Sequence, residues 1–279
     1  MDILWIVLGS VAGFVVLCFC LFLIIIRPAT GKREIMKRYK GVKFAHRGLH
    51  DDKKAENSMP AFAAAVECGY GIELDVRLSK DGELVVFHDD TVDRMTEAKG
   101  RVDSFTAEEL SGLHLGGTED GVPTFRQVLD LVDGKIPLLV EMKEELGKYG
   151  VAEKTAEMLR EYKGEYIVES FNPLSLAHFG TLMPEVAKGL LCSNYLKHPK
   201  TRSLAYFAVQ NMMMNVHCKP DFIAYDHAEW NNAGLTMIRT FYPKTPLVCW
   251  TLKSPEEEAA AKKHGFTSFI FENYKSELE

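Results

Sequence analysis

The chain has 279 residues, of which 47 % are hydrophobic and 26 % charged, and its formal net charge is −6. This composition provides enough apolar material for a large core. About 240 residues follow the first 40, which is typical of one α/β barrel or of two small domains. The mildly acidic balance gives no support for nucleic-acid binding, which requires clustered Lys and Arg to meet the phosphates.

The first feature along the chain is an uncharged apolar run from Ile3 to Ile26. Because a helix rises about 1.5 Å per residue, this run is long enough to cross the ~30 Å hydrocarbon core of a membrane. A cleaved signal peptide is the alternative, but it would have a basic start and a small-residue cleavage site. The pattern therefore predicts an uncleaved transmembrane helix over residues 3–26.

Basic residues dominate the next segment, residues 27–42, and extend one residue beyond it. Only Glu34 opposes the cluster of Arg27, Lys32, Arg33, Lys37, Arg38, Lys40 and Lys43. Because positive flanks stay cytoplasmic, we expect a single-pass membrane protein with its N-terminus outside and its catalytic domain in the cytoplasm. The same segment is suited to contact membrane lipid with anionic head groups.

From residue 43 to residue 279, apolar runs alternate with amphipathic stretches. Strands are expected over 42–46, 71–78, 84–87, 137–142, 166–170, 187–191, 222–225, 246–251 and 267–271, and helices over 58–68, 106–113, 124–132, 151–162, 173–182, 204–216, 229–242 and 255–264. Alternating strands and helices favour an α/β fold with a parallel sheet. Eight such units predict a closed (β/α)8 TIM-type barrel.

Polar residues stand at the ends of three expected strands. The first strand ends in His46-Arg47-Gly48, and the strand ends of such a barrel form its active-site face. A His there moves protons near neutral pH, and an Arg grips a phosphate through its planar fork. The alternative interpretation is that His46 and Arg47 are satisfied by local hydrogen bonds.

Acidic residues alternate along the second strand. Because successive side chains point to opposite faces, Glu73, Asp75 and Arg77 share one face. Two carboxylates at this spacing repel each other unless a cation lies between them, and oxygen ligands suit Mg²⁺ or Ca²⁺. Alternatively, Arg77 and a Lys neutralise the pair. The strand over 137–142 repeats the pattern, because Glu141 and Lys143 share a face. Either Glu141 is a further metal ligand and Lys143 contacts a phosphate, or the two residues form an internal ion pair.

Ser79-Lys80-Asp81-Gly82 is a turn signal, and Asp-Gly is a strong hairpin marker. A two-residue loop of Asp81 and Gly82 would pair Asp75 with His88 across the hairpin. Opposite residues share a face, with Cβ atoms about 5 Å apart. This register predicts that His88 lies beside the two carboxylates.

These motifs, in this order, resemble the glycerophosphodiester phosphodiesterase family. The resemblance covers about residues 43–271 and rests on His46-Arg47-Gly48, Glu56-Asn57, Gly71-Ile72-Glu73-Leu74-Asp75-Val76, Lys80-Asp81-Gly82, Val85-Val86-Phe87-His88-Asp89, Glu141-Met142-Lys143, Ser170-Phe171-Asn172-Pro173 and Trp250-Thr251. It implies a (β/α)8 barrel that binds one divalent cation, Mg²⁺ or Ca²⁺. Matching by motif position implies that Glu73, Asp75 and Glu141 are the metal ligands.

The resemblance also implies roles for the remaining motif residues. His46 and His88 would be the acid/base pair, and Arg47 and Lys143 would neutralise the substrate phosphate. Trp250 would line the pocket near the glycerol, and Glu56 would lie at the rim of the site. The family commonly has Pro-Glu-Asn-Thr where this chain has Ala55-Glu56-Asn57-Ser58, a mild exchange because Ser caps a helix as Thr does.

The expected activity is the metal-dependent hydrolysis of glycerophosphodiesters, or of lysophospholipids with the same head, to glycerol phosphate and an alcohol. One alternative is a related barrel phosphodiesterase that acts on an intact lipid head group. Another is an inactive membrane-anchored binding protein, which the loss of a motif residue would have favoured. No such loss is found among His46, His88, Glu73, Asp75 and Glu141.

Overall fold

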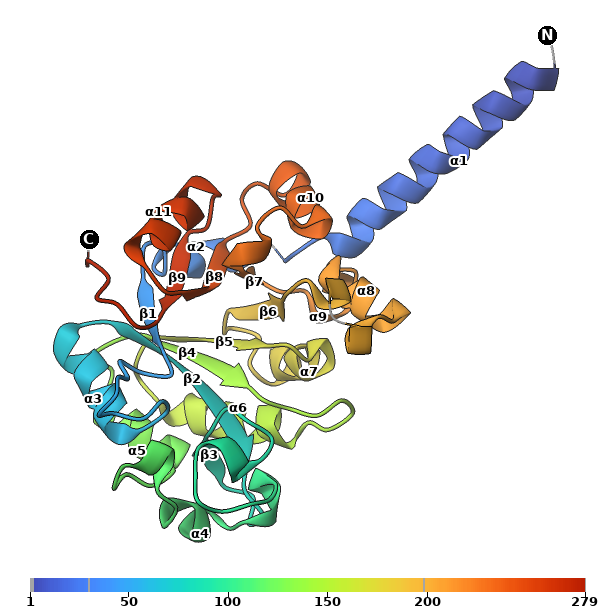
Figure 1. Ribbon diagram of the computed structural model, residues 1–279. Coiled ribbons are helices and arrows are strands. Elements are labelled where there is room, and N and C mark those ends of the chain that lie inside the picture. The colour runs from blue at the N-terminus through green and yellow to red at the C-terminus, as the bar shows by residue number, and fades with distance from the viewer. Residues whose placement is uncertain (1–2, 30, 198, 279) are drawn as a thin grey trace.

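A computed structural model describes residues 3–29, 31–197 and 199–278. Eight parallel strands form a closed barrel, and a ninth strand lies antiparallel to one of them (Figure 1). The strands are β1 Lys43–His46, β2 Gly71–Leu78, β3 Leu84–Val86, β4 Leu138–Met142, β5 Tyr166–Ser170, β6 Lys188–Cys192, β7 Phe222–Asp226, β8 Leu247–Leu252 and β9 Ser268–Phe271. The predicted TIM-type barrel is confirmed.

The chain also forms helices, most of which surround the barrel and separate its parallel strands, whereas α1 and α2 precede β1. They are α1 Ile3–Ile26, α2 Arg33–Lys37, α3 Met59–Cys68, α4 Ala107–Ser111, α5 Phe125–Val132, α6 Gly150–Glu161, α7 Pro173–Leu182, α8 Leu204–Gln210, α9 Asn215–Cys218, α10 Ala233–Phe241 and α11 Pro255–Lys263. Ser58 accepts a hydrogen bond from Ala61 N at 3.3 Å, and Gly69 ends α3 in the left-handed conformation. These are the start and stop signals that the sequence provides for this helix.

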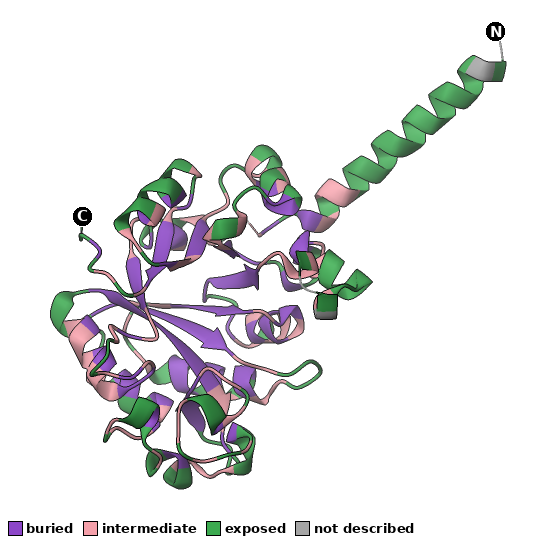
Figure 2. Cartoon of the chain, viewed as in Figure 1, coloured by how far each residue is buried: buried purple, intermediate pink, exposed green. Residues whose placement is uncertain are grey.

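The barrel closes because β1 pairs with both β2 and β9. Ala45 lies opposite Ile72 on one side and Phe271 on the other. One buried apolar cluster fills the barrel and includes Met36 and Tyr39, from α2 and the turn after it. A larger cluster lies between the strands and the surrounding helices. Figure 2 shows the resulting pattern of buried strands and exposed outer helix faces.

Helix α1 projects from the barrel and is exposed along most of its length (Figure 2). Its carboxyl end is fixed to the barrel: Asn215 Nδ2 donates to Ile26 O at 2.7 Å, and Tyr242 OH donates to Leu23 O at 2.5 Å. Lys32 then forms an ion pair with Asp221 at 3.2 Å. Residues Trp5–Ile26 are long and apolar enough to cross a membrane, a property that cleaved signal sequences share.

The register predicted for the hairpin is wrong. Val76 pairs with Val86 and Leu78 with Leu84, so the loop has three residues and Asp75 lies opposite Phe87 instead of His88. Gly82 occupies the left-handed region at φ 81°, as expected for a three-residue hairpin loop. The Ser79 hydroxyl accepts from Glu83 N at 3.0 Å and closes the turn one residue earlier than predicted.

The single helix predicted over 204–216 is also wrong, because the chain forms α8 and α9 with a break between them. Met212 is buried in the left-handed region at φ 60°, which a continuous helix cannot include. Asn211 also packs against Gly234 so closely that a Cβ on the glycine would lie 2.7 Å from Asn211 Cα. The break therefore lets this segment fit against α10.

Candidate active site

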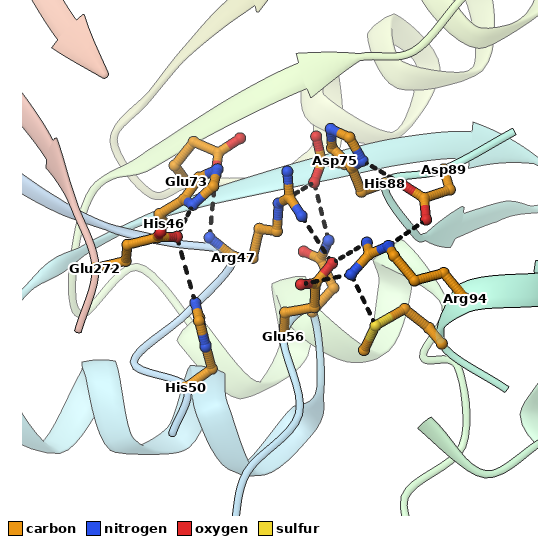
Figure 3. A network of polar contacts seen from close by, with 12 residues as sticks. His46, Arg47, His50, Glu56, Glu73, Asp75, His88, Asp89, Arg94 and Glu272 are labelled. Carbon is orange, nitrogen blue, oxygen red and sulfur yellow. Dashed lines mark hydrogen bonds and ion pairs between the residues drawn. The ribbon is translucent and has the colours of Figure 1, made fainter. Parts of the chain in front are cut away.

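Polar side chains from six strands or the residues after them meet at the carboxyl end of the barrel. They surround a cavity of about 160 Å³ that is lined by His46, Arg47, Glu73, His88, Glu141, Lys143, Glu169, Phe171, Leu191, Trp250, Thr251 and Ile270. Seven of the nine residues predicted for the site belong to this lining. Of the other two, Asp75 is buried behind the lining, and Glu56 lies at the edge of the cavity in a network of charged groups (Figure 3).

The strand register brings the acidic residues together. His46 on β1 lies beside Glu73 on β2, and Asp75 on β2 lies beside Glu141 on β4. In a parallel barrel, neighbouring residues at the same level point to the same side. The i, i+2 pattern of β2 therefore places both of its carboxylates inside the barrel, as predicted.

Glu73, Asp75 and Glu141 form a buried cluster suited to a cation. One carboxylate oxygen from each lies within 4.8 Å of the others. Lys143 Nζ lies 3.1 Å from Asp75 Oδ1 and 2.6 Å from Glu141 Oε1, so the internal ion pair considered as an alternative is present. This pairing leaves the cluster rich in negative charge, because Glu169 is also buried nearby. An all-oxygen donor set with excess negative charge fits a hard divalent cation.

The charge imbalance appears in the pKa values of the cluster. Burial, with the charges of Asp75 and Glu141, raises the pKa of Glu73 well above its usual range. Burial also raises the pKa of Glu141 to about 7. Burial opposes ionisation of Asp75 as well, but Lys143 and Arg47 outweigh it and lower the pKa of this carboxyl. The protein's own cations thus stabilise the charged form of Asp75, whereas the charged forms of Glu73 and Glu141 stay disfavoured.

His46 enters the cavity from the end of β1 and is held from behind. Its Nδ1 donates to Glu272 Oε2 at 2.6 Å, and its Nε2 lies 4.0 Å from Glu73 Oε2. Burial lowers the pKa of His46, although the hydrogen bond with Glu272 acts in the opposite direction and raises it. The ring is therefore oriented with Nε2 toward the carboxylates (Figure 3).

His88 is held in the same manner on the opposite side. Its Nδ1 donates to Asp89 Oδ1 at 2.6 Å, and Arg94 Nε donates to Asp89 Oδ2 at 2.5 Å. Burial lowers the pKa of His88, although the nearby charge of Asp75 opposes this effect. Arg94 also binds Glu56 at 2.6 Å, which connects this side of the site to the first strand (Figure 3).

Arg47 lies between the two histidines. It has a left-handed backbone at φ 53°, and its N–H donates to Glu73 Oε2 at 3.0 Å. Its guanidinium binds Glu56 at 2.7 Å and lies 3.5 Å from Asp75. Asn57 Nδ2 donates to Asp75 Oδ2 at 2.9 Å, so the second oxygen of this carboxylate is fixed as well.

Sequence reasoning missed several residues of the site. Glu272 binds His46, Glu169 adds a fourth buried carboxylate, and Phe171 forms part of the cavity wall. A signal existed for Glu272, because it directly follows an apolar strand as His46 ends one. Another existed for Glu169, because a lone acidic residue lies within the apolar strand β5.

Residues 46–275 match the model of the glycerophosphoryl diester phosphodiesterase family. The chain belongs to this family. The match spans the barrel from its first histidine to the segment after β9. The resemblance inferred from the motifs is therefore confirmed, together with the expectation of a phosphoric diester hydrolase.

Relatives in this family come from bacteria and animals. The chain is 41 % identical to a glycerophosphodiester phosphodiesterase from Caldanaerobacter subterraneus subsp. tengcongensis over 172 residues, or 57 % of this chain and 70 % of the relative. It is 30 % identical to human glycerophosphodiester phosphodiesterase 1 over 132 residues, or 44 % of this chain and 38 % of the relative.

The barrel is also similar to a solved structure of an Oleispira antarctica phosphodiesterase in complex with the product sn-glycerol-3-phosphate. The TM-score is 0.71 at 20 % identity, and the superposition covers 85 % of this chain and 95 % of that chain. A likeness at this level of identity concerns the fold.

Proposed function

We propose that the chain hydrolyses glycerophosphodiesters, or lysophospholipids with the same glycerophosphate head, to a glycerol phosphate product and an alcohol. The observation that carries this proposal is the arrangement around one cavity of a buried carboxylate cluster, two oriented histidines and two cations. Glu73, Asp75 and Glu141 would hold one divalent cation, Mg²⁺ or Ca²⁺. When bound, the cation supplies positive charge that polarises the phosphoryl group.

Arg47 and Lys143 are the protein's own positive charges at the cavity. Both line it, and both are already balanced by carboxylates behind them. Burial opposes the charge of Lys143, but Asp75 and Glu141 outweigh it and raise the pKa of this amine. Lys143 therefore stays charged at neutral pH and, with Arg47, binds phosphate oxygens and stabilises the charge of the transition state.

The two histidines divide the proton transfers. One takes a proton at Nε2 from the attacking oxygen, which belongs to water or to a neighbouring hydroxyl of the substrate. The other gives a proton at Nε2 to the oxygen of the leaving alcohol as its bond to phosphorus breaks. His46 and His88 suit these roles because a carboxylate binds the Nδ1 of each ring, which directs Nε2 toward the cavity. Trp250 lines the same cavity beside the place proposed for the glycerol.

The test is release of choline and glycerol phosphate from glycerophosphocholine by the full chain, with chelator and then with added Mg²⁺ or Ca²⁺. We expect chelation to abolish release, the added cation to restore it, and His46→Ala or His88→Ala to lower kcat by about 10²–10⁴-fold. His217→Ala is the matched control, because His217 is exposed outside the site. Full release after chelation would contradict the metal assignment, and no release with the cation supplied would contradict the proposed activity.

We further propose that residues 3–26 anchor the enzyme in a membrane as a single helix, that residues 27–42 form a basic segment at its surface, and that residues 43–279 form the catalytic domain. The length and apolar composition of α1 support this proposal, as does its exposure. The excess of Arg and Lys after Ile26 supports a cytoplasmic catalytic domain.

A further inference from the structure

A second cavity lies beside the catalytic cavity, and Phe171 lines both. It has a volume of about 520 Å³, and we call it the apolar groove. Its lining comes from the segment after β4, the start of α7 and the region around α8: Glu144, Leu146, Phe171, Asn172, Pro173, Leu174, Tyr195, Ala205, Tyr206, Ala208, Val209 and Met214. Ligand sites in proteins have volumes of this size.

Aromatic rings form a continuous wall from the catalytic cavity into the apolar groove. Phe171 packs edge-on against Trp250, with ring centroids 5.6 Å apart, and against Tyr195 at 6.5 Å. Tyr195 in turn contacts Tyr206 on α8 at 5.3 Å. A molecule held at Trp250 can therefore extend along apolar surface toward α8.

The charged and amide groups that line the groove are already occupied within the protein. Glu144 accepts hydrogen bonds from the backbone N–H groups of Val151 and Ala152 at 2.9 and 3.0 Å and caps the start of α6. Asn172 Oδ1 accepts from Leu174 N at 3.0 Å and caps α7. The groove therefore presents mainly hydrocarbon to an occupant, which indicates an apolar ligand.

The groove also lies next to the carboxyl end of α1. Met214 lines the groove, and the next residue, Asn215, binds the backbone of Ile26. On α8, Leu204 is 83 % exposed and Phe207 is 45 % exposed. Figure 1 shows α8 near the end of α1, with α10 on the other side. If α1 crosses a membrane, these exposed apolar side chains lie at the membrane surface.

We propose that the apolar groove binds the acyl chain of a membrane-borne lysophospholipid while its glycerophosphate end occupies the catalytic cavity. This inference rests on the proposed function and adds to it a binding site for the acyl chain of the lysophospholipid. One groove that shares Phe171 with the catalytic cavity suits a lipid with one chain. In the reaction, water adds to phosphorus, the bond from phosphorus to the head-group oxygen breaks, and the leaving alcohol takes a proton. The products are an acylglycerol phosphate and the free alcohol.

The first test compares choline release from glycerophosphocholine with release from lysophosphatidylcholines of increasing chain length, by the full chain in lipid nanodiscs with Mg²⁺ or Ca²⁺. A fully buried methylene changes affinity by about four-fold. We expect kcat/KM to rise at least about ten-fold from the hexanoyl to the dodecanoyl lipid. A flat series with active hydrolysis of glycerophosphocholine would overturn the groove assignment and leave the proposed function intact.

A matched pair of variants separates binding in the groove from simple enrichment of the lipid in the bilayer. Ala205→Trp fills the groove, whereas Ala259→Trp adds the same side chain at an exposed position of α11. The ratio of dodecanoyl lipid to glycerophosphocholine turnover should fall at least about ten-fold in Ala205→Trp and stay constant in Ala259→Trp. An unchanged ratio would overturn the proposal, and a change in oligomeric state instead would assign the groove to a second copy of the chain.

A second measurement does not depend on turnover. A lysophosphatidylcholine with a diazirine in its acyl chain is photolysed with the full chain in nanodiscs, and the labelled peptides are identified by mass spectrometry. We expect labels on residues 171–174 and 205–214. The amount of label at these residues, divided by the amount on α1, should be lower in Ala205→Trp than in the wild-type protein. Labels on α1 without labels in the groove would refute the proposal, even if the protein hydrolyses none of the substrates.

Discussion

His46 presents one ring nitrogen to the catalytic cavity because Glu272 binds the other. The carboxylate accepts from Nδ1 at 2.6 Å, while Lys253 Nζ lies 3.0 Å from its second oxygen. Glu272 is therefore a positioning residue that fixes the tautomer and the orientation of His46. Its effect on catalysis should appear in kcat, because Glu272 does not line the catalytic cavity.

We expect Glu272→Gln to lower kcat for glycerophosphocholine by about 10–100-fold with little change in KM. The expected loss is smaller than the full contribution of an acid/base histidine, because His46 itself remains. Steady-state kinetics measure kcat and KM, and the apparent Tm reports the stability of the variant. Lys253→Met is the control, because it removes a 61 % exposed partner of the same carboxylate and should change kcat less than about two-fold. A fall in Tm that accounts for the lost activity, or an unchanged kcat in Glu272→Gln, would contradict the positioning role.

At the scale of residues, the sequence predicted the carboxylate cluster because the two-residue period of a strand places Glu73 and Asp75 on one face. The strand ends then located His46 and Lys143 at the same edge of the barrel. Contacts such as the one between His46 and Glu272 join residues 226 positions apart. Their identification required the closure of β1 against β9, and no local pattern encodes that pairing.

Apart from α2, which was not predicted, the secondary-structure elements followed local signals except at two places. Apolar periodicity predicted the barrel strands and most helices, because each is a regular element with one buried face. The hairpin loop was one residue longer than predicted, because its length depends on the Ser79 hydroxyl and on the left-handed Gly82. The break between α8 and α9 depends on packing of Asn211 against Gly234, which lies 23 residues away along the chain.

Glu258 on α11 joins three elements at the base of the barrel. Lys43 Nζ of β1 lies 3.0 Å from its Oε1, and Ser276 and Tyr274 of the terminal segment donate to its Oε2. Burial would raise the pKa of Glu258, but the hydrogen bonds from Ser276, Lys43 and Tyr274 lower it to about 2. A carboxyl with a lowered pKa stabilises the fold fully above its unfolded pKa of 4.5 and loses this effect as the pH falls toward 2.

Glu258→Gln should therefore destabilise the protein at pH 7 by about 3 kcal/mol, because buried Lys43 loses its charged partner. This corresponds to a Tm lower by about 6–12 °C. In thermal unfolding followed by tryptophan fluorescence, the difference in Tm between the wild-type protein and Glu258→Gln should become smaller from about pH 5 to pH 3. Glu67→Gln, at an exposed position of α3, should leave Tm nearly unchanged. An equal deficit at pH 7 and pH 3 would rule out the ionised form of Glu258 as the source of stability.

At the scale of the whole molecule, the proposed orientation of the barrel at a membrane rests on the apolar α1 and on the basic residues after it. Short basic flanks are retained in the cytoplasm. We expect a reporter active only in the cytoplasm to give signal when fused after residue 279, and a reporter active only outside to give signal when fused before residue 1. A cytoplasmic reporter that is active at the N-terminus and silent at the C-terminus would reverse the proposed orientation.

The contact between Asn215 and Ile26 joins residues 189 positions apart. At about 5–20 residues per second, the ribosome adds Asn215 roughly 10–40 s after Ile26. The barrel likewise cannot close until β9 has been synthesised, because β1 pairs with β9. If α1 enters a membrane on emergence, as proposed, it is in place before its partner Asn215 exists, and the barrel then completes its fold around an N-terminal end that the bilayer holds.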